Sequence, residues 1–163
     1  MRGLEAAVAD HYTYVSKSTI RVDRYDRRAE FADADAPLHY GVMGGLRDHY
    51  GVRAEMPTLP APVDQLVAAV GACMHGTLQG ALRARKVDYD RSTFVAEVEG
   101  TLEGAENSAL RVTRIHVRYQ LAVPADQREA AERAVAVHAR ACPVHESVKD
   151  SIDVTWTAEI ADR

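Results

Sequence analysis

The chain has 163 residues, 47% of them hydrophobic and 27% charged, which is enough for one folded domain with a substantial core. Its net charge of −4 gives no electrostatic basis for binding nucleic acid or an anionic membrane. No leader pattern opens the sequence, and His75 interrupts the longest apolar run too early for it to span a bilayer. Two cysteines in such a chain predict a reducing, cytoplasmic location. We therefore expect a single domain over residues 1–163.

The first third of the chain has two short β-leaning stretches and a long irregular one. Residues 11–22 predict a strand, and a turn then leads into a second short strand near 28–31. Residues 32–60 are rich in Gly and Pro and predict a loop, with a short helical turn near 46–50. So long a loop in a compact domain usually has a function or covers something.

The segment from Pro62 to Lys86 predicts the helix around which the chain is organised. Pro62 suits the first turn of a helix, and Asp64 lies near the positive end of the helix dipole. Apolar residues recur through the segment at helical spacing and occupy almost every side, so we expect the helix to be buried on most sides. The positions that recur at this spacing are Leu66, Val70, Cys73, Thr77, Leu78, Ala81 and Leu82.

Small residues form a ridge on this helix at Ala68, Ala72, Gly76 and Gly80, each four positions apart. Glycine inside a helix costs about 1 kcal/mol relative to alanine, so two on one ridge suggest close approach of another backbone. Two interpretations stay open: packing against the same helix of a partner subunit, and packing against the chain's own sheet.

The second half predicts three strands and two helices. Alternating apolar residues over 93–102 and 114–121 indicate two antiparallel strands, and the alternation over 152–160 indicates a third strand. Pro124 begins a helix that ends near Ala141, with Ala130, Ala134, Val137 and Ala141 facing inward. Pro143 begins a short helix that runs through Lys149. The fold class is α+β, with a mostly antiparallel sheet packed on helices.

The two cysteines are the strongest candidates for chemistry. Cys142 precedes Pro143 at an expected N-cap, where free N–H groups and the helix dipole would lower its pKa. A small capping residue without chemistry is the alternative. Taken alone, Cys73 is predicted to be a buried thiol of the core, because free cysteine is among the most buried residue types. As a pair, however, the two cysteines suggest a site that cycles between dithiol and disulfide.

Other candidate groups give weaker signals. Cys73, His75, Cys142 and His145 would supply four zinc-type ligands, but Cys73 and His75 point to different faces of one helix, so we expect no metal site. His116 lies on the polar face of a strand, where solvation is the simpler interpretation, and His138 is expected to line a helix interface.

Two motifs in register resemble the OsmC/Ohr family of thiol-dependent peroxidases. The first is Pro62-Val-Asp-Gln-Leu-Val-Ala-Ala-Val-Gly-Ala-Cys73, which has the family's spacing from proline to the first cysteine. The second is Cys142-Pro-Val-His-Glu-Ser-Val148, which lies before a short helix and a final strand, as in the family. The order of elements also matches, so the resemblance covers nearly the whole chain.

The resemblance implies an OsmC-like fold in an intertwined homodimer, with two long central helices back to back and active sites at the subunit interface. By analogy, Cys73 would attack a peroxide and become a sulfenic acid. Cys142 would resolve it to a disulfide, which a dithiol reductant reopens. No cofactor or metal is needed.

The hydroperoxidase branch also uses an arginine near the first hairpin and a glutamate just after the proline. Arg24 is the best match to the arginine, with Arg21 as the rival. Val63 occupies the glutamate position, and Asp64 follows as a shorter acid that matches other branches of the family. The resemblance thus assigns catalytic roles to Cys73, Cys142, Arg24 and Asp64, and the Val63 departure puts efficient hydroperoxide reduction in question.

We therefore interpret the chain as an OsmC-like peroxidase whose partners are a small peroxide, a dithiol reductant and a second copy of itself. Hydrophobic neighbours of Cys73, such as Leu66, Val70 and Met74, would favour organic hydroperoxides over hydrogen peroxide. Two alternatives stay open. One is an OsmC-like protein without peroxidase activity that binds a small apolar ligand or a partner; the other is a thiol-based redox sensor.

Overall fold

The computed structural model describes residues 20–22, 29–31, 38–55, 58–104 and 109–163. The chain divides into two compact units, residues 1–59 and residues 60–163. The two candidate thiols both belong to the second unit.

The described residues of the first unit form a small antiparallel sheet in the order β1-β2-β3 and a short helix. Its strands are β1 (Ile20–Val22), β2 (Ala29–Phe31) and β3 (Leu38–Tyr40), and the helix is α1 (Leu46–His49). β1 confirms the end of the strand predicted over 11–22, whose residues 11–19 lie outside the described residues, and β2 and α1 confirm the second strand and the helical turn. The loop prediction for 32–60 missed β3, because three residues are too short for an alternation and their pairing with β2 is what makes them a strand.

The second unit is built on the sheet β4-β5-β6, formed by β4 (Val95–Glu103), β5 (Arg111–Val123) and β6 (Asp153–Asp162). β4 and β5 are antiparallel, as predicted. β6 runs parallel to β5, with Ile115 opposite Val154 and Leu121 opposite Ile160. A parallel neighbour requires a crossover, and the helical segment between β5 and β6 provides it.

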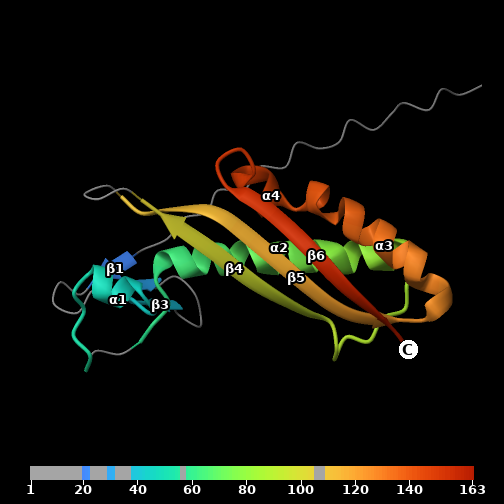
Figure 1. The fold of residues 1–163 in the computed structure, drawn as a ribbon, viewed down its shortest axis with the longest axis horizontal. Coiled ribbons are helices and arrows are strands. Elements are labelled where there is room, and N and C mark those ends of the chain that lie inside the picture. The colour runs from blue at the N-terminus through green and yellow to red at the C-terminus, as the bar shows by residue number, and fades with distance from the viewer. Residues whose placement is uncertain (1–19, 23–28, 32–37, 56–57, 105–108) are drawn as a thin grey trace, which may run out of the picture. The chain divides into compact units, whose positions relative to one another are not determined.

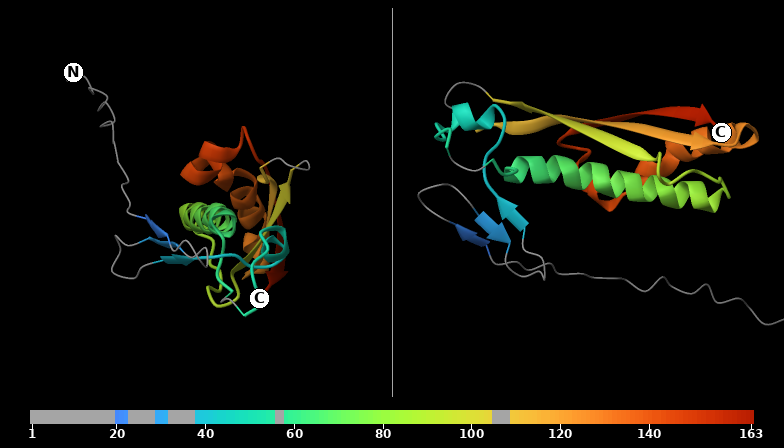
Figure 2. Two further views of the ribbon diagram at one scale, coloured as in Figure 1. Left: turned by 90° about the vertical axis from the view of Figure 1, so that its left-hand side faces the viewer. Right: turned by 90° about the horizontal axis from the view of Figure 1, so that it is seen from below.

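The helices of this unit lie on one face of the sheet, as the view along α2 in Figure 2 shows. They are α2 (Pro62–Ala84), α3 (Arg128–Val137) and α4 (Pro143–Val148), with 3-10 turns at Ala125–Gln127 and His138–Ala141. In Figure 1, α3 and α4 follow one another along the sheet, beside α2. The α+β class is confirmed, as is the mostly antiparallel pairing.

The core lies between the helices and the sheet. One face of α2 is fully buried there, through Val70, Met74, Leu78 and Leu82. β5 faces it with Ile115, Val117, Tyr119, Leu121 and Val123, all with at most 3% of their surface exposed.

The predicted inward face of the next helix was partly wrong. Ala134 is buried as predicted, but Ala131 is the other buried alanine of α3, and Ala141 is exposed. The buried stripe is Ala131, Ala134 and His138, which are three and four positions apart and therefore share one helix face, one position away from the predicted Ala130 and Val137. His138 thereby lies in the core.

The two sides of α2 differ more than the sequence suggested. Gly71 faces β4 so closely that an added Cβ would lie 2.1 Å from Val98 Cγ2. No described atom, by contrast, lies within 4 Å of a Cβ placed at Gly76 or Gly80. Leu66, one of the apolar positions at helical spacing, is 37% exposed. The ridge therefore does not pack against the chain's own sheet, and the expectation of burial on most sides was wrong for the described residues.

Candidate active site: a pair of thiols

Cys142 is the N-cap residue of α4, as predicted. Its backbone is extended (φ −87°, ψ 109°) and Pro143 occupies the first turn of the helix. The N–H of His145 donates a hydrogen bond to Cys142 Sγ at 3.4 Å. The sulfur thus takes the place that a serine or aspartate oxygen usually occupies at a cap.

Burial nevertheless dominates the acidity of this thiol. Cys142 has none of its surface exposed, and burial raises the pKa of its thiol, with a further rise from the side chain of Cys73. The N–H groups of His145 and Val144 act in the opposite direction but more weakly than burial does. The predicted lowering of the Cys142 pKa was therefore wrong, because desolvation of the thiolate outweighs what one short helix offers.

Cys73 lies in the middle of α2, partly buried against the core, and its side chain is in hydrogen-bonding contact with the Cys142 thiol. Both cysteines are free thiols. The fold therefore brings together two sulfurs that are 69 positions apart in the sequence (142 − 73). Cys73 is partly exposed and Cys142 is fully buried, so a reagent from solvent reaches Cys73 first.

The acid assigned by resemblance lies elsewhere in the described chain. Asp64 Oδ2 accepts a hydrogen bond from the N–H of Ala61 at 2.7 Å, which satisfies a free donor at the start of α2. Nine residues separate Asp64 from Cys73 (73 − 64), about 13 Å along a helix axis. Within one chain, Asp64 therefore stabilises the helix end rather than contacting the thiols.

The candidate arginines fall in the first unit. Arg24 lies outside the described residues. Arg21 is in β1, whose backbone alone is described. The structure thus places neither guanidinium relative to the thiols, and the choice between the two arginines stays a prediction.

The histidines near the cysteines in sequence have separate surroundings. His75 packs on Phe94, with ring centroids 4.2 Å apart, and its Nδ1 is 3.4 Å from Gln79 Nε2. His145 lies edge-on to Trp156 at 5.9 Å. Among the described residues, no three His, Cys, Asp or Glu side chains are grouped so as to hold a metal ion.

On the outer face of the sheet, His116 bonds the hydroxyls of Thr155 and Thr157 at 2.8 and 3.2 Å.

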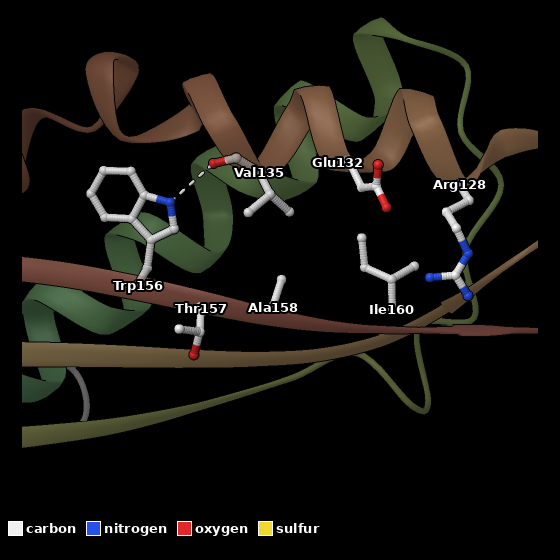
Figure 3. A pocket seen from close by; sticks show the side chains of 7 residues that line it. All are labelled: Arg128, Glu132, Val135, Trp156, Thr157, Ala158 and Ile160. Atoms are coloured by element: carbon white, nitrogen blue, oxygen red, sulfur yellow. Dashed lines mark hydrogen bonds between the residues drawn. The ribbon is translucent and has the colours of Figure 1, made fainter.

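A buried hydrogen-bonded cluster lies near Cys142 and was missed as a functional feature in the sequence. Tyr119 Oη and His138 Nε2 are 2.9 Å apart, and His138 Nδ1 is 2.8 Å from the carbonyl oxygen of Val135. The indole N–H of Trp156 donates to the same carbonyl at 3.1 Å, as Figure 3 shows. The available signal was Tyr119 at an apolar strand position, because a buried phenol needs a partner.

Two surface hollows of this unit contain neither cysteine. One, of about 260 Å³, lies between α3 and β6 and is lined by Arg128, Glu132, Val135, Trp156, Thr157, Ala158 and Ile160 (Figure 3). The other, of about 280 Å³, is on the outer face of the sheet beside His116 and Arg118. Of the apolar neighbours expected around Cys73, Val70 and Met74 are fully buried, whereas Leu66 is 37% exposed.

Comparison with protein families shows to which family the chain belongs. The model of the family described as OsmC-like protein matches residues 55–157. The chain belongs to the OsmC-like family. The matched range contains both cysteines of this OsmC-like protein and the whole of α2, and it leaves out β1 to β3 with the candidate arginines.

Solved structures of the family share this fold at low sequence identity. An OsmC-like protein from Mycoplasma pneumoniae superposes with a TM-score of 0.68 at 12% identity, over 90% of this chain and 98% of its own. The organic hydroperoxide resistance protein OhrB of Bacillus subtilis gives 0.63 at 19%, over 90% and 98%. An organic hydroperoxide resistance protein OsmC from Legionella pneumophila gives 0.65 at 15%, over 91% and 99%. No curated protein sequence matches the chain.

None of the helices in the described part of this OsmC-like protein is long and apolar enough to cross a membrane. The longest, α2, carries Asp64, His75 and Arg83 along its length.

Proposed function

We propose that this OsmC-like protein is a thiol-dependent peroxidase that reduces organic hydroperoxides. The observation that carries the proposal is the contact between a partly exposed thiol, Cys73, and a buried one, Cys142, in a fold that is shared with organic hydroperoxide resistance proteins. A peroxidatic thiol must be reached by substrate, whereas a resolving thiol must be reached only by the oxidised partner.

The reaction requires no group beyond the two thiols, a peroxide and a dithiol. The Cys73 thiolate attacks the terminal oxygen of the hydroperoxide, the O–O bond breaks, and the alcohol leaves after taking up a proton. Cys73 is then a sulfenic acid. Cys142 attacks its sulfur, the S–O bond breaks, and water leaves as the disulfide forms. A dithiol reductant returns both cysteines to thiols by exchange.

The apolar surroundings of Cys73 favour hydroperoxides that carry an organic group. Val70 and Met74 lie within one turn of Cys73 on α2 and belong to the core, while Leu66 presents an aliphatic side chain to solvent two turns earlier. An alkyl or aryl substituent would gain from covering the exposed part of Leu66, since Val70 and Met74 have no surface left to cover, and hydrogen peroxide has nothing to bury there.

Stabilisation of the Cys73 thiolate is assigned to an arginine, with Arg24 as the first candidate and Arg21 as the second. A guanidinium beside the sulfur would favour its anionic form and bind the peroxide oxygens. We expect Arg24→Lys to lower kcat/KM for the hydroperoxide by about 10-fold or more, since a lysine cannot reproduce the fork of donors. Arg21→Lys is the matched control, and the opposite ranking would move the assignment to Arg21.

A homodimer formed through the open side of α2 completes the proposal. Ala68, Ala72 and Gly76 are exposed there beside Leu66, and Gly76 has free space around it. Small residues allow the backbones of two helices to approach closely. Sedimentation of the purified protein tests the proposal, and a monomer at micromolar concentration contradicts it.

The experiment that tests the activity follows the loss of an organic hydroperoxide in the presence of protein and a dithiol. We expect rapid consumption by the unmodified protein and none above background for Cys73→Ser. Consumption that survives in Cys73→Ser would show that another group reacts with the peroxide.

A second function is favoured by one observation, the apolar Val63 at the position where hydroperoxidases have a glutamate. A family member without that acid would use the same scaffold to bind a small apolar ligand, and the thiols would be bystanders. Absence of peroxide consumption, together with binding of a fluorescent apolar probe that Leu66→Asp abolishes, would support this alternative.

A further inference from the structure

The hollow between α3 and β6 exists because a small residue lies on the inner face of the strand. Trp156, Ala158 and Ile160 alternate along β6 and therefore share one face, on which an alanine stands between two large side chains. Val135 of α3 lies across from them, and about 260 Å³ stays unfilled between helix and strand (Figure 3). In the described chain β6 is an edge strand, paired with β5 alone, so the hollow opens at the side of the sheet.

One end of the hollow is apolar and is held in place by Trp156. The indole N–H donates a hydrogen bond to the carbonyl of Val135 at 3.1 Å. The rings of His138 and His145 lie edge-on to the indole, with centroids 5.4 and 5.9 Å away. The apolar side chains that line the hollow also pack on the core. An apolar group can therefore bind against this wall without the cost of first ordering it.

The other end of the hollow is charged, and its balance is negative. Figure 3 shows the side chains of Arg128 and Glu132 reaching from α3 toward β6, at the end away from Trp156. Arg128 is already neutralised, because its Nε and Nη2 both donate to Asp162 Oδ1, at 3.1 and 2.5 Å. Glu132 has no hydrogen bond or ion pair with any described residue. The three groups together leave one uncompensated negative charge.

The helix itself provides no cation for Glu132. Four positions after it comes Ala136, and four positions before it comes Arg128, which is bonded to Asp162. Glu129, on the same helix, is different, since its carboxylate forms an ion pair with Arg133. Glu132 is thus a carboxylate beside an apolar hollow that has no partner within the described residues.

We propose that this hollow binds a small organic cation, a primary amine in its ammonium form that carries an alkyl or aryl group. The apolar group lies against Trp156 and Ala158, and the ammonium donates a hydrogen bond to Glu132. An anion of the same shape would be repelled by Glu132, and a neutral alcohol would offer only a weaker hydrogen bond. The volume is below that of most drug-sized sites, so the ligand is small. The inference does not depend on the thiols or on the proposed peroxidase activity.

The test uses the fluorescence of Trp156, which is the only tryptophan of the chain and lies in the wall of the hollow. The protein is titrated at neutral pH with phenethylammonium and with two molecules of similar shape, the neutral 2-phenylethanol and the anionic 3-phenylpropionate. We expect a saturable change in emission with the ammonium and a dissociation constant about 10-fold higher for the alcohol. With 3-phenylpropionate we expect no saturation.

Substitution of Glu132 tests the charged end. In Glu132→Gln the shape is kept and the charge is lost, so the dissociation constant of phenethylammonium should rise about 10-fold while that of 2-phenylethanol stays unchanged. Glu129→Gln is the matched control on the same helix, because the carboxylate of Glu129 is paired with Arg133. It should leave both constants unchanged.

Substitution of Ala158 tests the apolar end. In Ala158→Leu the larger side chain fills the space between Trp156 and Ile160, so binding of the ammonium and of the alcohol should both be lost. The exposed Ala161 on the same strand gives the control Ala161→Leu, which should bind both molecules normally. Melting temperatures show whether the variants are folded, and the two glutamate variants decide the question if Ala158→Leu is not.

Three results would overturn the proposal. The first is no saturable change with phenethylammonium at millimolar concentration. The second is binding that is as tight for 3-phenylpropionate, or that is unchanged in Glu132→Gln. The third is tighter binding of Nα-acetyl-lysine amide than of phenethylammonium, because the ammonium would then be that of a peptide side chain and not of a free amine.

Discussion

The surroundings of the two cysteines differ in almost every respect, although the sulfurs are in contact. Cys73 is partly exposed and lies on a helix whose far side is open. Cys142 is completely buried and its sulfur accepts a hydrogen bond from the N–H of His145. The two thiols are therefore not equivalent. A reagent from solvent can reach Cys73, whereas Cys142 is inaccessible to it and can react only with Cys73.

Burial has a chemical consequence for Cys142 that access alone does not explain. A buried thiol with a raised pKa is a poor nucleophile toward reagents from solvent, because only the thiolate reacts. It becomes effective when its target is already in contact with it, since the reaction is then intramolecular. The fold thus protects Cys142 from reagents in solvent while keeping it available to Cys73.

The largest expected effect follows from removing the buried member of the pair. In Cys142→Ser the sulfenic acid on Cys73 has no partner, so we expect steady-state peroxide consumption with a dithiol to fall by about 10²-fold or more while one round of reduction persists. Dimedone labelling of Cys73, detected by mass spectrometry, measures the trapped species. Unchanged turnover without a dimedone adduct would mean that the two thiols do not have different roles.

A smaller effect tests what holds Cys73 against Cys142. Gly71 packs on Val98 of β4, so Gly71→Ala forces the helix and strand apart and should lower the free energy of unfolding by about 1–3 kcal/mol. Gly76→Ala is the matched control: space is open there, and alanine should add about 1 kcal/mol to the stability of the folded chain. Denaturant unfolding measures both values.

The same pair of variants also probes the open side of α2. If a second copy packs on the ridge, Gly76→Ala should weaken the dimer in sedimentation experiments even though it favours the helix. Equal destabilisation by both substitutions would contradict the difference between the two sides of α2.

The smallest expected effect is in the pH dependence of stability. Burial lowers the pKa of His138 in the folded chain below its ordinary value of 6.5, so the unfolded chain binds a proton that the folded one does not. The resulting stability is complete above pH 6.5 and is lost as the pH falls through the lowered pKa. We expect His138→Gln to flatten this acid dependence of the melting temperature. An unchanged slope below pH 6.5 would show that His138 is not buried in its neutral form.

The sequence predicted the helices and strands correctly where their hydrophobic patterns are long. Twenty-three residues of helical spacing predicted α2, and alternation predicted β4, β5 and β6. β3 was missed because three residues carry no period, and the parallel pairing of β6 depends on where the crossover returns the chain. The inward face of α3 was placed one position off, because Ala130 and Ala131 are adjacent alanines and their side chains alone do not decide which one faces the core.

The candidate site could be predicted in position better than in chemistry. The Cys-Pro pattern placed Cys142 at a helix cap, and the resemblance paired it with Cys73, as the fold does. The direction of the Cys142 pKa shift was missed, because it depends on burial by residues distant in sequence. Asp64 illustrates the same limit, since its carboxylate is used by the backbone of Ala61.

The most direct test of the thiol pair is the product of a single oxidation. The reduced protein is mixed with one equivalent of an organic hydroperoxide, digested without reductant and analysed by mass spectrometry. We predict one product, a peptide pair linked by a disulfide between Cys73 and Cys142, formed in step with one equivalent of alcohol. Oxidation of Cys73 to a sulfinic acid while Cys142 remains a free thiol would contradict the account.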